Sequence, residues 1–139
     1  MSYKIIGKYI KELYFNIPNP KTFFLLSKDI TNYKINIDIK SSQTKKNIIE
    51  VFTSLSLTPT KNNFEIINTK IIYSTIVELE GDQPSKGEME KIILIEVPTK
   101  IYPELRKIFV FLFENSGFKD VKISETVDFD NLYKMRKVQ

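Results

Sequence analysis

The hydrophobic pattern of this chain changes its period once, near residue 86, and this change restricts the folds open to it. Before that point, apolar residues recur at every second position, most clearly in KINIDIK at residues 34–40, which is typical of half-buried strands. After it, apolar residues recur at helical spacing. Strands with short links, followed by helices, predict an α+β fold in which one antiparallel sheet is followed by a helical layer.

Four segments of the first half have the strand pattern: residues 9–17, 34–40, 48–58 and 64–77. Simple alternation is expected to place the apolar side chains of the first segment on one face, namely Tyr9, Leu13, Phe15 and Ile17. With 139 residues and no linker or repeat, we expect a single domain, residues 1–139, with the sheet in 1–80 and the helical part in 86–139.

The second half predicts three helices. Residues 87–96 form a short one, Pro98 suits the start of the next, and Asp128 caps a last helix near the C-terminus. The middle helix, at residues 101–116, is apolar nearly all round, and Gly117 suits its C-terminal end. Its second face is covered either by the chain's own loops or by another subunit.

An apolar run follows the first strand. Pro18-Asn19-Pro20 ends that strand and predicts a loop, which then contains FFLL at residues 23–26. Two interpretations of this run are compatible. The loop folds its apolar side chains back onto the edge of the sheet, or it presents them as a binding surface.

The composition excludes most enzyme chemistry of small domains. The chain has no Cys and no His, so zinc sites, thiol nucleophiles and imidazole bases are absent. The acidic residues between 78 and 90 lack the spacing of a calcium loop, and the four glycines form no phosphate-binding loop. We predict no catalytic residue, no metal site and no cofactor.

The charge and the apolar runs of the chain limit which partners and which cellular compartment are expected. The longest apolar run, Ile108 to Phe113, is too short to span a bilayer and the N-terminus lacks a secretory signal, so we expect a cytoplasmic protein without stable membrane insertion. The net charge is +4, and Tyr14 with nearby lysines could form a stacking platform for nucleic acid. Because these lysines are scattered, a small basic nucleic-acid-binding domain remains only an alternative.

Four stretches together resemble the SecB protein-export chaperone family, in its order and spacing and over about 130 residues. They are YIKELYFNIPNP at 9–20, INIDIKSSQ at 35–43, EKIILIEVPTKIYPELRKIFVFLFENSGF at 90–118 and ETVDFDNLY at 125–133. The resemblance implies a homotetramer built as a dimer of dimers with helices packed between the dimers. It also implies an ATP-independent holdase, not an enzyme, that binds unfolded preproteins and passes them to the SecA motor.

The resemblance also assigns residues. Client binding falls to a crossover loop, the second strand and the last helix: Phe23, Phe24, Leu26, Ile35, Ile37, Ile39 and Tyr133. The oligomer interface falls to the long helix: Ile108, Phe109, Phe111 and Leu112. The SecA-docking candidates are Glu12, Asn16 and Glu65.

Three departures from the family bear on SecA. The chain is basic where the family is acidic, Asn16 stands where an acid is common, and no tail follows the last helix. A SecB-like chaperone dedicated to one partner, of the toxin–antitoxin type, is therefore a further alternative.

Overall fold

The computed structural model describes residues 2–28, 33–59, 68–82, 84–118 and 123–138. It confirms one four-stranded antiparallel sheet with helices. The strands are β1 (Ser2–Asn16), β2 (Tyr33–Lys45), β3 (Ile48–Pro59) and β4 (Asn68–Glu80). The helical segments are α1 (Pro20–Lys28), α2 (Lys86–Lys91), η2 (Ile92–Glu96), α3 (Val97–Glu114) and α4 (Phe129–Val138). The predicted strand at 64–77 begins within 60–67, which lies outside the described residues.

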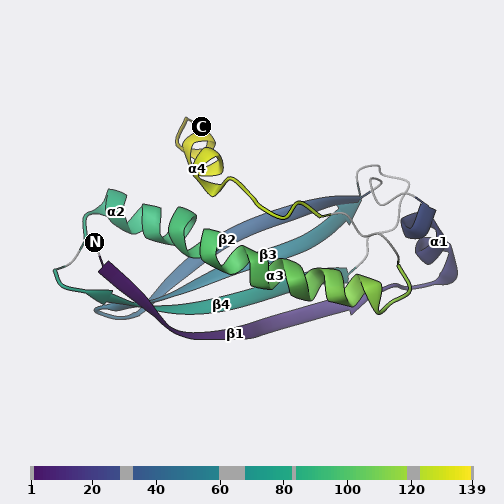
Figure 1. The fold of residues 1–139 in the computed structure, drawn as a ribbon, viewed down its shortest axis with the longest axis horizontal. Coiled ribbons are helices and arrows are strands. Elements are labelled where there is room, and N and C mark those ends of the chain that lie inside the picture. The colour runs from purple at the N-terminus through teal and green to yellow at the C-terminus, as the bar shows by residue number, and fades with distance from the viewer. Residues whose placement is uncertain (1, 29–32, 60–67, 83, 119–122, 139) are drawn as a thin grey trace.

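The strands lie in the order β1-β4-β3-β2, so β1 and β2 are the two edges of the sheet. The central strands bury one face almost completely, because alternate residues of β3 and β4 turn toward the helices: Val51, Leu55, Ile71 and Val77. Figure 1 shows α2, η2 and α3 running as one long helix across that face. Leu105, Phe109 and Phe113 of α3 fill the core against the sheet.

Strand β1 does not keep the simple alternation expected from its sequence. A register shift between Ile10 and Glu12 leaves Lys11 as an extra residue. Tyr9 therefore pairs with Ser74, on the face away from the helices, whereas Leu13 pairs with Ile71 on the covered face. The prediction that Tyr9 shares a face with Leu13 was wrong, because one inserted residue reverses the side chains before it, as far as a second register shift between Ile5 and Gly7.

The predicted break between two helices at Pro98 is also absent. Backbone dihedrals stay helical from α2 into α3, and Val97 N–H donates to the carbonyl oxygen of Ile92 in a wider turn. This π turn precedes Pro98, which has no N–H to donate, so the helix passes the proline without ending. The caps were predicted correctly: Asp128 Oδ1 accepts from Asn131 N–H at 2.9 Å, and Gly117 ends α3 with φ of 92°.

Candidate functional site

Two adjoining cavities lie beside edge strand β2, and we call them together the β2 groove. The larger has a volume of about 630 Å³ and is lined by Ile39, Lys40, Ser41, Glu90, Ile93, Leu94 and Tyr133. The smaller, about 180 Å³, is lined by Ile37, Asp38, Ile39, Leu94, Phe129, Leu132 and Tyr133. Because both contain Ile39, Leu94 and Tyr133, they form one continuous groove.

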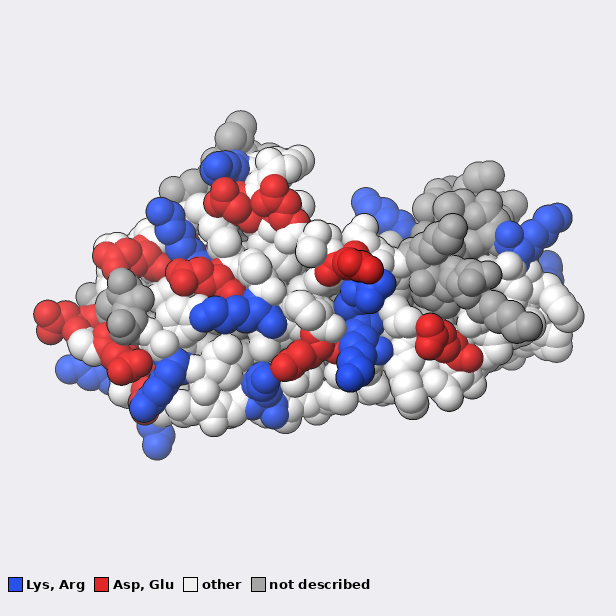
Figure 2. Space-filling view, in the orientation of Figure 1, with Lys and Arg blue, Asp and Glu red and all other residues white. Residues whose placement is uncertain are grey.

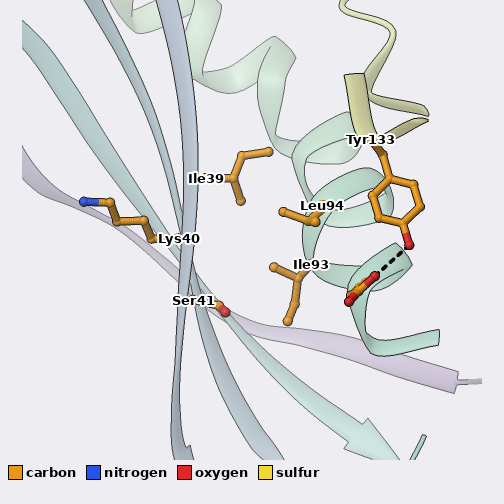
Figure 3. Close-up of a pocket in the computed structure, with 7 residues that line it drawn as sticks. Ile39, Lys40, Ser41, Ile93, Leu94 and Tyr133 are labelled. Carbon is orange, nitrogen blue, oxygen red and sulfur yellow. Dashed lines mark hydrogen bonds between the residues drawn. The ribbon is translucent and has the colours of Figure 1, made fainter. Parts of the chain in front are cut away.

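Three elements supply the walls of this groove. Ile39 comes from β2, Leu94 from η2 and Tyr133 from α4, and Figure 3 shows these side chains on the same side of β2. Tyr133 is 8% exposed, and its hydroxyl donates to Glu90 Oε2 at 2.8 Å. This hydrogen bond ties α4 to the end of α2. The helical wall of the groove is thus mostly apolar, and the polar lining residues are Glu90, which pairs with Tyr133, and Asp38, Lys40 and Ser41 along β2.

The structure brings together only part of the predicted client-binding set. Ile37, Ile39 and Tyr133 line the β2 groove. Ile35 lies half-buried on the same face of β2, packed against the core, but is not a lining residue of either cavity. The alternation of the second strand therefore placed its isoleucines on the correct face.

The FFLL segment lies in helix α1, so the prediction of a loop was wrong. Asn19 Oδ1 accepts from Thr22 N–H at 2.9 Å and caps this helix. Leu26 is 2% exposed within the core, which corrects its assignment to an open client surface. The Phe23 ring packs on Phe118 with centroids 4.9 Å apart, while Phe24 is 66% exposed. Helix α1 lies toward the end of the sheet opposite α2 and contributes no lining residue to the groove.

The four oligomer-interface candidates divide by burial. Phe109 is 0% exposed in the core of its own chain, so its assignment to a subunit interface is corrected. Phe111 is 60% exposed, and Ile108 and Leu112 are half-buried against the core. The solvent face of α3 is otherwise largely polar, because helical spacing adds Lys100, Lys107 and Glu114 to it.

Two of the SecA-docking candidates, Glu12 and Asn16, lie on the other face of β1. Glu12 pairs with Ile72 and Asn16 with Asn68, and both side chains are exposed. Glu65 lies outside the described residues.

That uncovered face holds a polar cluster that the sequence did not reveal. Tyr9 OH and Ser74 Oγ both donate to Glu50 Oε2, the latter at 2.5 Å, and the two hydrogen bonds lower the pKa of Glu50. Nearby, the Lys11 ammonium lies 4.3 Å from the Phe52 ring centroid. Tyr14, the proposed stacking residue, is exposed on this face beside Glu12. Acidic side chains thus lie beside the lysines at the predicted stacking platform for nucleic acid.

Charges of both signs also alternate on the helix-covered face, as Figure 2 shows for the described residues. Lys8 Nζ lies 2.8 Å from Glu104 Oε1 there, and Tyr73 OH donates to the other oxygen of Glu104 at 3.1 Å. Within the described ranges, no helix is long and apolar enough to cross a membrane. The same ranges contain no group of three or more side chains placed to hold a metal ion.

Sequence reasoning missed eight lining residues of the β2 groove: Asp38, Lys40, Ser41, Glu90, Ile93, Leu94, Phe129 and Leu132. Ile93 and Leu94 each lie one helical turn after Glu90, in a segment that was assigned to a helix. Their spacing could have identified a second apolar side of that segment. Phe129 and Leu132 lie one turn from Tyr133 or next to it on the last helix.

Comparisons with known proteins give a consistent result. The family described as SecB, preprotein translocase subunit SecB, matches residues 1–139. A putative protein-export protein SecB of Pelagibacter ubique is 41% identical over 97% of this chain and 96% of its own. The protein-export protein SecB of Anaplasma phagocytophilum is 24% identical over 94% and 89%. A Mycobacterium tuberculosis SecB-like chaperone, Rv1957, solved with a peptide from the HigA1 antitoxin, has a TM-score of 0.64 at 11% identity over 88% and 89%. At 11% identity, this last likeness shows only that the two proteins share a fold.

Proposed function

Because this chain belongs to the SecB family of preprotein translocase subunits, we propose that it is a protein-export chaperone that holds unfolded precursors in the β2 groove without ATP. The observation that carries this site is the groove itself, a cavity of about 630 Å³ whose lining includes Ile39, Ile93, Leu94 and Tyr133. We propose that the chain is a single domain, that it acts in the cytoplasm, and that it has neither catalytic activity nor a cofactor.

An apolar groove suits clients that have no common sequence. Each apolar side chain that it buries contributes roughly 1.5–3 kcal/mol before the cost of ordering the client. Several such contacts along one unfolded chain then combine through their effective concentration. A folded protein hides its apolar segments, so the groove selects the unfolded state without a nucleotide.

We propose that the chain assembles as a dimer of dimers. Phe111 on α3 and the residues Ile10 and Leu13 on β1 support this, because all are exposed apolar side chains, and the two on β1 pair with core-facing residues of β4. Transfer of clients to SecA is the finer proposal. Glu12 and Asn16 are exposed, as contact with SecA requires. However, Lys11 and Lys70 on the same face make that face less acidic.

The less acidic face of β1 favours an alternative function, that of a chaperone dedicated to one partner. It predicts a narrow choice of clients and no binding to SecA. The nucleic-acid alternative gains no support from the described residues, because Glu12 and Glu50 lie among the lysines and tyrosines of the uncovered face. Its affinity would fall steeply with salt, whereas apolar holding tolerates salt.

Two matched variants test the site. Leu94→Gln removes a half-exposed groove residue, and Phe24→Gln removes an exposed apolar residue of α1 outside the groove. The affinity for an unfolded precursor should fall about tenfold in the Leu94 variant and by less than about twofold in the Phe24 variant. Equal affinities in two well-folded variants would remove the β2 groove from the client site, and loss in the Phe24 variant alone would move that site to α1.

A further inference from the structure

The buried apolar side chains of the described residues form two clusters, one toward the α2 end of the sheet and one toward the α1 end. On β3, Val51 belongs to the α2-end cluster and Leu55 to the α1-end cluster. On β4, Val77 and Ile71 are divided in the same way. The core therefore consists of two separately packed halves.

Polar residues of the sheet lie between these halves. Thr53 is the helix-facing residue between the two clusters on β3, and Tyr73 and Thr75 are those on β4. Thr53 and Thr75 are both 0% exposed, and neither hydroxyl has a hydrogen-bond partner among the described residues. A buried hydroxyl without a partner lowers stability. The sheet thus contributes little cohesion at this boundary.

The helical layer has its own weak point at the same level. Helix α3 passes from the α2-end cluster at Ile101 to the α1-end cluster at Leu105. Pro103 lies between these two residues, inside the helix. Because proline has no N–H, it cannot donate to the carbonyl oxygen of Thr99 one turn earlier, and an interior proline favours bending. We call Thr53, Thr75 and Pro103 together the core joint.

The polar contacts beside the core joint lie near water. Lys8 Nζ and Tyr73 OH both contact the carboxylate of Glu104, at 2.8 and 3.1 Å. The side chains of Lys8 and Glu104 are 40% and 44% exposed. An ion pair as exposed as this one contributes little to stability, since water replaces it at low cost. These contacts therefore allow the two halves to move against one another.

The β2 groove extends across the core joint. Ile93 on its wall packs with the α2-end cluster, whereas Phe129 belongs to the α1-end cluster. Ile39 lines both cavities and contacts both clusters. Bending at the core joint moves the two parts of the helical wall relative to one another and so changes the width of the groove.

We propose that the core joint bends to fit the β2 groove to client side chains of different size. This inference rests on the proposed function and concerns how one groove accepts many clients. When the joint opens, water reaches the hydroxyls of Thr53 and Thr75, and the hydrogen bonds they gain offset part of the apolar contact that is lost. Valine at these positions would gain nothing from opening.

Three proteins test the proposal: the wild type, a joint variant with Thr53→Val and Thr75→Val, and the control variant Thr69→Val. Thr69 also lies on β4, is 2% exposed and has a hydroxyl without a partner among the described residues. It pairs with Phe15, away from the core joint. Both variants should be at least as stable as the wild type in urea, because each replaces a partnerless hydroxyl by a methyl group.

Two peptides of about nine residues serve as probes. Both have lysines at their ends and threonine at alternate positions, and the remaining positions are valine in one peptide and tryptophan in the other. The joint variant should bind the tryptophan peptide about tenfold more weakly than the wild type, and the valine peptide within about twofold. The control variant should bind both peptides within about twofold of the wild type.

Spin labels measure the bending directly. Because the chain has no cysteine, Lys91→Cys on α2 and Met135→Cys on α4 place one label on each side of the groove, at exposed positions. The distance between the labels should be longer with the tryptophan peptide bound than with the valine peptide bound. Equal distances in the two complexes would overturn the proposal.

Other results would also overturn the core joint. They are a joint variant that binds both peptides like the wild type or loses both equally, a joint variant less stable than the wild type, and a wild type that holds an unfolded precursor but not the tryptophan peptide. The chaperone function itself stands in each case as long as the precursor is held. Failure of the wild type to bind both peptides and the precursor would contradict the proposed function as well.

Discussion

Glu50 shows how one carboxylate joins three strands on the uncovered face of the sheet. It lies on β3 and accepts hydrogen bonds from Tyr9 on β1 and Ser74 on β4. Ser74 is fully buried, so its hydroxyl needs this partner. The hydrogen bonds favour the ionised carboxyl and lower the pKa of Glu50.

We predict that Glu50→Gln makes the stability of the protein less sensitive to acid. A carboxyl whose pKa is lowered by folding stabilises the protein above its unfolded pKa, about 4.3, and loses that contribution as pH falls through the folded pKa. Urea unfolding should show a cost of about 1 kcal/mol for the variant at neutral pH. The cost should shrink near pH 3, and an equal cost at both pH values would contradict the prediction.

Phe109 gives the second residue-scale prediction. Its ring lies 5.1 Å from that of Phe113, inside the core. Phe109→Ala should lower the free energy of unfolding by about 3–5 kcal/mol, because it leaves a cavity. Lys107→Ala, two residues away on the solvent face, is the control and should change stability by less than about 0.5 kcal/mol. A small effect at Phe109 would mean that the ring does not hold the core.

At the scale of elements, the sequence predicts the strands and helices whose apolar residues recur at a regular period. It does not predict the places where an inserted residue or a wider turn interrupts that period. The strands from 34–40 and 48–58 were predicted because Ile35, Ile37 and Ile39 alternate strictly and β3 buries every second residue. The bulge at Lys11 and the π turn before Pro98 were not predicted, because each departs from a regular period at one residue. Of the groove, Ile37, Ile39 and Tyr133 were predicted, whereas Ile93 and Leu94 depend on how η2 meets β2.

Helix α1 was missed for a different reason. Asn19 and Pro20 satisfy the rule for a turn and equally the rule for a capped helix start. Packing decides between the two, since Leu26 enters the core and the Phe23 ring packs on Phe118. Phe118 lies some 90 residues away from Phe23 in the sequence, beyond the range of any local pattern.

The hydrogen bond between Tyr133 and Glu90 should hold α4 against the groove. We predict that Tyr133→Phe weakens this docking by about 1 kcal/mol, so amide exchange in α4 should accelerate by about fivefold. Lys134→Gln is the matched control, because it removes only an exposed pair with Asp130. Identical exchange in both variants would show that the Tyr133 hydroxyl does not hold α4 in place.

At the scale of the whole molecule, the proposed assembly makes the exposed apolar residues candidates for subunit contacts. We predict that Phe111→Asp lowers the mass of the protein in solution while leaving its circular dichroism unchanged, because it replaces an exposed apolar side chain of the proposed interface by a charge. Met135→Asp alters an exposed apolar residue of α4 and should leave the mass unchanged. An unchanged mass in the Phe111 variant would exclude this face of α3 from assembly.

The central claim, that this SecB-family chain holds unfolded proteins, is tested most directly by light scattering after gel filtration. The protein is measured alone and with a permanently unfolded precursor, at low and at high salt. We predict a mass of about four chains alone and co-elution with the precursor at both salt concentrations, because apolar contacts are not screened. Elution apart from the precursor, or a complex that high salt dissolves, would contradict the claim.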